Sequence, residues 1–274
     1  MAITAADVNR LRKQTGAGMM DCKKALVEAD GDFEAAIDIL RKKGQKVAAK
    51  RADRDASEGL VIAKSSGNGK NAVIVVVNCE TDFVAKNEDF TNFANTIADK
   101  AIDNLPTSLD ELKSLDYGDG NSIADKLTEQ TGVIGEKIDV SAYEKLEAGT
   151  VFAYNHPGNK VASVVGLSEE GQSDAAKDVA MQVAAMAPIA VNEDSIPQDV
   201  IQRELEVGKE LAIQEGKPAE MAEKIAQGRL KKFFKESTLL HQQYIKDNKM
   251  TIQQFLDAEQ KGLTVTDFKR FSLS

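Results

Sequence analysis

A pattern of strand, turn, strand and helix occurs twice in the middle of this chain of 274 residues, and it limits how the chain can fold. In the first copy, residues 60–64 and 71–78 are apolar enough to form strands, and the turn between them is rich in Ser and Gly. An amphipathic helix follows over 90–102, with an apolar stripe wide enough to cover one face of a small sheet. Residues 107–148 mix helix and strand patterns, and we expect them to complete this unit.

The second copy repeats this order with smaller side chains. Residues 149–155 and 161–167 are predicted strands joined by a polar turn, and a helix follows over 176–187. Each hairpin has an apolar face that its helix can bury. The sequence therefore predicts an α+β fold whose core consists of two similar β-hairpin-plus-helix subdomains, residues 58–148 and 149–196.

The N-terminal segment, residues 1–45, has the signals of a compact three-helix domain. Thr4 to Asp7 can form a capping box at the start of the first helix, and the turn Gly16–Gly18 separates it from the second. Asp32 can cap a third helix, and the basic residues after its apolar face favour a helix C-terminus. We expect Gly44 to end that helix.

Three further segments complete the predicted organisation. Residues 46–57 are rich in Lys and Arg and poor in large apolar residues, which is typical of a linker or a solvated extension of the preceding helix. Residues 197–260 are predicted to form a helical hairpin inserted into the second subdomain, with Pro218 in the first turn of its second helix. Residues 261–274 are predicted to return to the core as a final strand.

Composition and charge argue against several classes of function. The chain has 35 Lys and Arg against 44 Asp and Glu, a net charge of −9, which disfavours bulk electrostatic binding to nucleic acid or to an anionic membrane. Its longest apolar run, Ala72–Val77, is far shorter than the roughly 20 residues that span a bilayer. The start of the chain lacks the pattern of a signal peptide. We expect a cytoplasmic protein whose two cysteines, Cys22 and Cys79, are reduced thiols.

The chain contains few of the residues from which catalytic or metal sites are built. It has two His and two Cys, and it lacks the HExxH, CxxC and GxSxG motifs, so we expect no catalytic residues, no metal and no cofactor. The segment Gly67–Lys70 has the wrong spacing for a phosphate loop and precedes a strand. A dyad of Cys79 and His156 is disfavoured because Glu80 and Asp82 would oppose ionisation of the thiol.

The segment after the strand at 71–78 is the strongest candidate for a binding site. Asp82 and Phe83 are expected at a strand-to-helix turn, where an apolar side chain is available to a partner. Alternatively, Thr81 or Asp82 caps the long helix and Phe83 packs back onto the core. The corresponding turn of the second unit, Leu167–Gly171, has no aromatic residue, so the fold does not require one there. We therefore favour a binding role.

Other candidate residues lie elsewhere in the chain. Met19 and Met20 are adjacent and cannot both face one helix core, so we expect one of them to be exposed. An exposed methionine is adaptable contact surface, and simple packing at the start of the helix is the alternative. His156 lies in a turn, where a solvated histidine is more common than a ligand. Two alternative functions stay open: a thiol enzyme that uses Cys79, and an RNA binder that uses the basic segment Lys46–Arg54.

Three segments of the chain resemble bacterial translation elongation factor Ts. They are Leu11–Leu26, Asn78–Lys86 and Gly216–Phe233, and together they extend the resemblance over almost the whole chain. The resemblance implies a ubiquitin-associated-type three-helix N-terminal domain, an α+β core of two similar subdomains, and a helical insertion that mediates homodimerisation in some members. Some members also continue into a C-terminal helical module, whereas this chain stops at Ser274, so we expect that contact to be absent.

The resemblance also implies a function. Members of this family exchange guanine nucleotide on elongation factor Tu, and an Asp-Phe pair, here Asp82 and Phe83, wedges between helices of the partner's GTPase domain. The Mg²⁺ ion at the nucleotide then belongs to the partner. The partner-binding residues that the resemblance implies are Arg12, Met19, Met20, Thr81, Asp82, Phe83, Val84 and His156.

Overall fold

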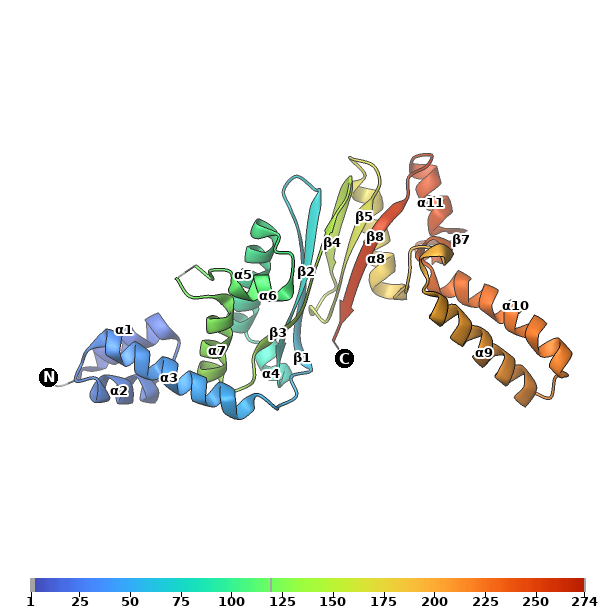
Figure 1. The fold of residues 1–274 in the computed structure, drawn as a ribbon. Helices are drawn as coiled ribbons and strands as arrows, with labels where there is room; N and C mark the ends of the chain where they lie inside the picture. Colours follow the sequence, from blue (N-terminus) through green and yellow to red (C-terminus); the bar gives the residue numbers. More distant parts are fainter. Residues whose placement is uncertain (1–2, 119, 274) are drawn as a thin grey trace.

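The structure is a computed structural model that describes residues 3–118 and 120–273. Helices and small antiparallel sheets form an α+β protein, as the sequence predicts. The molecule is elongated, with helices α1 to α3 at one end, the sheets in the middle and the hairpin of α9 and α10 at the other end (Figure 1).

The N-terminal helices are α1 (Ala5–Thr15), α2 (Met19–Glu28) and α3 (Phe33–Arg51). Both predicted caps are present: Thr4 forms a capping box with the third residue of α1, and the Asp32 side chain accepts hydrogen bonds from backbone N–H groups of α3. The apolar faces of these helices pack around a small core of their own, which contains Val8, Leu11, Ala17, Cys22, Ala25, Leu26 and Ala36.

Gly44 does not end α3, contrary to the prediction. The helix continues to Arg51, so the first part of residues 46–57 is a helical extension, one of the two predicted alternatives for that segment. Gly44 is buried against Gly132 of helix α7 (Ile123–Ile134), and a Cβ atom added to Gly132 would lie 2.4 Å from the Gly44 Cα. The missing side chain of Gly132 lets the backbones of α3 and α7 approach at Gly44. Gly44 therefore lies where two helices cross, and it does not mark the end of a helix as the sequence indicated.

The first sheet consists of β1 (Glu58–Ser65), β2 (Asn71–Cys79) and β3 (Asp139–Glu147), with β2 in the centre and antiparallel to both neighbours. Helix α5 (Glu88–Asn104) covers one face, and the short helix α6 (Leu109–Ser114) packs beside it. The core between sheet and helices includes Leu60, Ile62, Val73, Val75, Phe90, Phe93, Ile97 and Leu112.

The second sheet has the same arrangement within the described part of the chain. Its strands are β4 (Thr150–Asn155), β5 (Val161–Leu167) and β8 (Val265–Ser272), with β5 in the centre. Helix α8 (Ser173–Met186) covers one face of this sheet. The edge strand β8 comes from the C-terminal end of the chain, as the prediction of a final strand requires.

The two sheets also bury apolar side chains against each other. Alternate residues of β1 and β2 turn away from α5 and form a shared cluster with β4 and β5, whose members include Val61, Ala63, Ile74, Val76, Val151, Ala162 and Val164. Strand β2 is therefore buried on both faces. This explains why its sequence is a continuous apolar run and does not alternate with polar residues.

Residues 197–260 differ in part from the prediction of one helical insertion. Helices α9 (Gln198–Gln214) and α10 (Ala219–Ser237) form the predicted hairpin, after a 3₁₀ turn η1 (Glu193–Ser195). The next segment does not belong to the hairpin. It begins with a second 3₁₀ turn, η2 (Leu239–His241), and continues back along α8.

This returning segment contains a small antiparallel pair, β6 (Gln243–Tyr244) and β7 (Asp247–Thr251), followed by helix α11 (Ile252–Glu259). Its apolar residues join the core under α8, because they would otherwise be left exposed beside the hairpin. Those residues are Leu239, Leu240, Tyr244, Ile252, Phe255 and Leu256.

Candidate functional site

The segment after β2 forms a single helical turn, α4 (Asp82–Ala85), which exposes Phe83. The Phe83 side chain is 83% exposed, whereas Ala85 is 4% exposed and Val84 packs against the core. The long helix α5 has a cap of its own, because the Asn87 side chain accepts a hydrogen bond from the Asp89 N–H at 2.8 Å. The alternative in which Phe83 packs back onto the core is therefore wrong.

Asp82 forms an ion pair at the start of α4. Its carboxylate lies 2.6 Å from Nζ of Lys86, one helical turn further on. The hydrogen bond that Lys86 donates lowers the pKa of Asp82 below its ordinary value, and Asp82 is therefore a carboxylate at neutral pH. Both side chains are substantially exposed, so this pair orients charge at the rim of Phe83 and contributes little to stability.

The backbone just before Asp82 is held by Glu136, which follows α7. One carboxylate oxygen, Oε2, accepts hydrogen bonds from the N–H groups of Glu80 at 3.1 Å and Thr81 at 3.0 Å. The other oxygen, Oε1, accepts a hydrogen bond from the Thr81 hydroxyl at 2.7 Å. Glu136 was not predicted as a site residue, because a contact between residues so far apart in the chain leaves no local sequence pattern.

Glu80 connects this turn to the end of α3. The Arg51 guanidinium donates to both carboxylate oxygens of Glu80, at 2.8 and 2.9 Å. The Lys137 N–H also donates to Glu80, at 2.6 Å, and this bond is the main cause that lowers the pKa of Glu80, followed by the bond from Arg51. The turn that exposes Phe83 is thus fixed from two sides.

Cys79 is a buried structural residue. Its side chain is fully buried, and burial together with the nearby charge of Glu136 raises the pKa of the thiol to about 12. The direction of this pKa shift agrees with the prediction, but the acidic neighbours that raise the pKa are Glu136 and Glu58, and not Glu80 and Asp82. A thiol with such a pKa is a poor nucleophile, which disfavours an enzyme that uses Cys79.

Met19 and Met20 are both exposed, at 54% and 62%. The prediction that one of them is exposed is confirmed, and the other is exposed as well, because the buried face of α2 begins at Cys22 and its first turn projects beyond the core. Arg12 is exposed near the end of α1. All three side chains are therefore available at the surface of the N-terminal helices.

A cleft of about 530 Å³ connects the N-terminal helices with α4. Gly16, in the turn before Met19, lines it from one side, and Val84, next to Phe83, lines it from the other. The structure therefore brings two of the candidate segments to the same region. The remaining lining residues come from α5, α7 and the loop between α6 and α7: Asn87, Asp89, Phe90, Asn92, Phe93, Thr96, Tyr117, Gln130, Val133 and Ile134.

His156 is exposed in the turn between β4 and β5, and its Nδ1 lies 3.0 Å from the Tyr154 hydroxyl. The turn is attached to β1, because Lys160 forms an ion pair with Glu58. The charge of Lys160 also lowers the pKa of Asp82. The His156 turn therefore lies at the same end of the sheets as α4.

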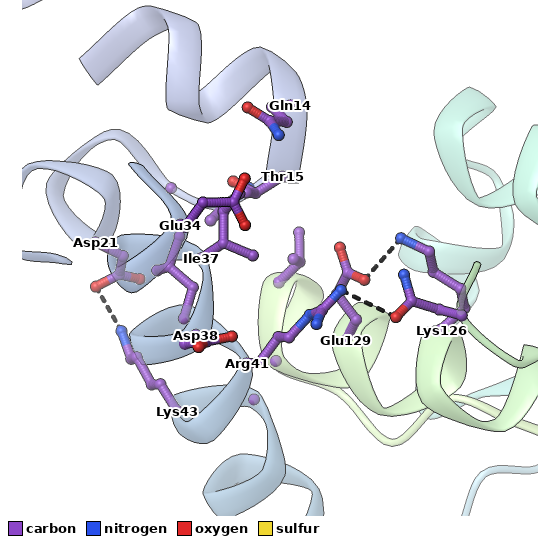
Figure 2. Close-up of a pocket in the computed structure, with 17 residues that line it drawn as sticks. Gln14, Thr15, Asp21, Glu34, Ile37, Asp38, Arg41, Lys43, Lys126 and Glu129 are labelled. Atoms are coloured by element: carbon purple, nitrogen blue, oxygen red, sulfur yellow. Dashed lines mark hydrogen bonds and ion pairs between the residues drawn. The ribbon is translucent and has the colours of Figure 1, made fainter. Parts of the chain in front are cut away.

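A second cleft, of about 350 Å³, lies where α3 and the end of α1 face α7 (Figure 2). Asp21 pairs with Lys43 at 2.5 Å, Arg41 donates to the Asn121 side chain at 2.9 Å, and Lys126 pairs with Glu129 at 2.7 Å. These charged groups are already engaged within the chain. We interpret this cleft as the joint between the N-terminal helices and the core.

Two further features are absent from the part of the chain that the structure describes. Across residues 3–118 and 120–273, the His, Cys, Asp and Glu side chains form no group of three or more that could hold a metal ion. Among the helices of the same residues, none combines the length and apolar character needed to cross a membrane.

These features define an α+β protein whose candidate site is an exposed aromatic residue on a fixed turn, which is typical of a site that binds another macromolecule. A family model described as Elongation factor TS matches residues 80–274. The chain belongs to the elongation factor Ts family, and its role is in translation elongation.

Curated relatives named Elongation factor Ts match along nearly their whole length. The protein of Christiangramia forsetii is 55% identical over 273 residues, covering 99% of this chain and 98% of the relative. That of Porphyromonas gingivalis is 48% identical, covering 100% and 99%. That of Cytophaga hutchinsonii is 49% identical, covering 99% of each.

Proposed function

We propose that this chain is a guanine-nucleotide exchange factor for elongation factor Tu, and that it acts in the cytoplasm during translation elongation. The observation that carries this proposal is Phe83, an aromatic side chain 83% exposed on a turn that hydrogen bonds hold in place. Family membership supplies the partner. In this proposal Phe83 inserts between helices of the partner's GTPase domain and fills an apolar pocket there.

Exchange of this kind follows from linkage and needs no catalytic group on this chain. A factor that binds the nucleotide-free partner more tightly than the nucleotide-bound partner must weaken nucleotide affinity by the same ratio. Insertion of Phe83 displaces the partner helices that support its phosphate and Mg²⁺ contacts. The Mg²⁺ ion belongs to the partner throughout, and this chain contributes shape and contacts.

The other candidate residues have distinct parts in this proposal. The Thr81 backbone and hydroxyl fix the turn, Asp82 orients it through its charge, and Val84 anchors α4 to the core. Arg12, Met19 and Met20 form a second contact to the GTPase domain, across the cleft that Gly16 and Val84 line. His156 faces the partner's other domains from the same end of the sheets.

We also propose the finer architecture that the family resemblance implies. Helices α1 to α3 form a ubiquitin-associated-type domain, and the two sheets are copies of one β-hairpin-plus-helix unit. Their shared strand order and their covering helices support this interpretation. The hairpin of α9 and α10 is the insertion through which two copies associate in some family members, and it leaves apolar residues exposed, namely Val207, Leu211, Ile213 and Met221.

Release of labelled GDP from purified elongation factor Tu tests the proposed function. The protein should accelerate release when present at much less than one copy per partner, because an exchange factor dissociates and acts again. Release that is unchanged, or that rises only in proportion to the amount of factor bound, would show that the chain is not an exchange factor. Heat-denatured protein provides the control.

A further inference from the structure

We infer that Glu136 is a positioning residue for nucleotide exchange: its carboxylate sets the turn that presents Phe83 before the partner arrives. This inference rests on the proposed function and deepens it. Glu136 lies far from Phe83 in the sequence, and it reaches the turn through the backbone N–H groups of Glu80 and Thr81 and through the Thr81 hydroxyl.

The geometry of these contacts suits a positioning role. Two successive N–H groups converge on one carboxylate oxygen at 3.1 and 3.0 Å, and the hydroxyl donates to the other oxygen at 2.7 Å. Hydrogen bonds to a charged acceptor are stronger than neutral ones. They fix the two successive peptide groups before Thr81 and also the Thr81 side chain, so the direction in which Phe83 leaves the surface is determined before binding.

Glu136 is itself held in place. It follows Gly135, which ends α7 in a left-handed conformation. On its other side, the Lys137 N–H donates to Glu80 at 2.6 Å, and the Ile138 N–H donates to the Thr131 hydroxyl at 3.1 Å. The carboxylate therefore has a rigid base, and hydrogen bonds hold the turn before Phe83 and the segment after α7 against each other.

Preorganisation explains why an exchange factor benefits from this arrangement. A loop that must become ordered on binding loses conformational entropy at that moment, and this loss weakens the complex. Phe83 makes little contact with its own chain, so its position depends on the backbone below it. If Glu136 is removed, the same side chain is present, but in a wider range of directions, and insertion becomes less frequent.

A purely stabilising role is the competing explanation, and Glu111 offers a matched control for it. Glu111, in α6, accepts hydrogen bonds from the Thr107 N–H at 2.6 Å and from the Thr107 hydroxyl at 2.5 Å. These are the same kinds of hydrogen bond as at Glu136, one backbone N–H bond fewer and from a residue in the same local segment, but α6 lies away from α4 along the sheet (Figure 1). Glu111→Ala should weaken the fold locally without affecting exchange.

The test is a double-mutant cycle on stimulated GDP release from elongation factor Tu at saturating factor. We expect Glu136→Ala to slow release by about tenfold to a hundredfold, the range that misplacement of a contacting group causes. In the Phe83→Ala background the same change should alter the rate by less than about twofold. Glu136 acts on release only by positioning Phe83, so its removal has little further effect once the Phe83 side chain is gone. Glu136→Gln should retain most of the rate, since its amide oxygen can still accept both N–H bonds.

Several outcomes would overturn the inference while leaving the proposed function intact. These are normal release with Glu136→Ala, equal fractional losses in both backgrounds, or a loss matched by Glu111→Ala. Thermal unfolding of each variant checks that it is folded at the assay temperature. Should Glu136→Ala not fold, Thr81→Val removes the hydroxyl bond alone and must show a smaller loss with the same dependence on Phe83. Failure of the unmodified protein to accelerate release would instead contradict the proposed function.

Discussion

Phe83 and Phe90 lie in neighbouring helices, yet the first is 83% exposed and the second 2%. The fold uses Phe90 as core and leaves Phe83 outside. Phe83→Ala should therefore change the free energy of unfolding by less than about 0.5 kcal/mol, as exposed substitutions generally do. Phe90→Ala should lower it by about 3–5 kcal/mol because it leaves a cavity. Urea denaturation of both variants compares them directly, and similar losses would mean that Phe83 has a structural role.

Cys79 provides a second prediction at the scale of one residue. Burial raises the pKa of its thiol to about 12, so at pH 8 almost all of it is the unreactive thiol and it is also shielded from reagent. Iodoacetamide at pH 8 should therefore label Cys79 far more slowly in the native protein than in urea. Mass spectrometry of the Cys79 peptide measures this ratio. Equal labelling in both states would restore Cys79 as a candidate nucleophile.

Residues differ in how far their roles could be predicted. Phe83 was identifiable because the corresponding turn of the second unit has no aromatic residue. The fold therefore does not require an aromatic side chain at that position. The exposure of one methionine was predictable from their adjacency, but the exposure of the second was not, because helical spacing does not show where the buried face of α2 begins. Glu136 could not be found at all, since only the fold brings it to Glu80 and Thr81.

At the scale of elements, the crossing of α3 and α7 determines where the N-terminal helices sit. The missing side chain of Gly132 allows the two backbones to approach at Gly44, and Arg51 and Lys137 attach the far end of α3 to the turn before Phe83. The Lys137 Nζ donates to the Ala52 carbonyl at 2.8 Å. Two proposed contact regions, the N-terminal helices and α4, are thereby fixed relative to each other.

Gly132→Ala should disturb this crossing. The new Cβ atom would lie 2.4 Å from the Gly44 Cα, so the helices must separate, at a cost of about 1–3 kcal/mol in unfolding free energy. Stimulated GDP release should also slow, because Met19 and Met20 move relative to Phe83. Thermal unfolding and the release assay measure the two effects.

Two glycine variants serve as controls for that experiment. Gly44→Ala places its Cβ atom no closer than 3.5 Å to its nearest neighbour and should be tolerated. Gly228→Ala, in α10, meets nothing within 4 Å and should stabilise the protein by about 0.5–1 kcal/mol through helix propensity. If Gly132→Ala lowers neither the unfolding free energy nor the rate of stimulated GDP release, the close crossing of α3 and α7 does not fix the position of the N-terminal helices.

The helices and strands were largely predictable from the sequence. Which of them pack against each other was not. Caps at Thr4 and Asp32 and the apolar run in β2 mark helix starts and a buried strand through local chemistry. The failures came where tertiary packing decided the outcome. Gly44 continues a helix because α7 lies against it, and residues 239–260 leave the predicted insertion because their apolar side chains are buried under α8.

At the scale of the whole molecule, the sheets form a central body from which the two ends project (Figure 1). The sequence predicted two similar units, but the cluster that joins their sheets depends on alternate faces of β1, β2, β4 and β5 meeting in space. The packing of the two sheets against each other places the His156 turn and α4 at the same end of the sheets. The proposed contacts to the partner therefore extend from the N-terminal helices across both sheets.

The most direct test of the account is the rate of labelled GDP release from elongation factor Tu at saturating concentrations of the unmodified protein and of Phe83→Ala. We predict that the variant folds normally and binds, but that release slows by at least about thirtyfold, which corresponds to the ~2 kcal/mol cost of losing a binding hot spot. An unchanged rate at saturation would contradict the claim that Phe83 drives exchange.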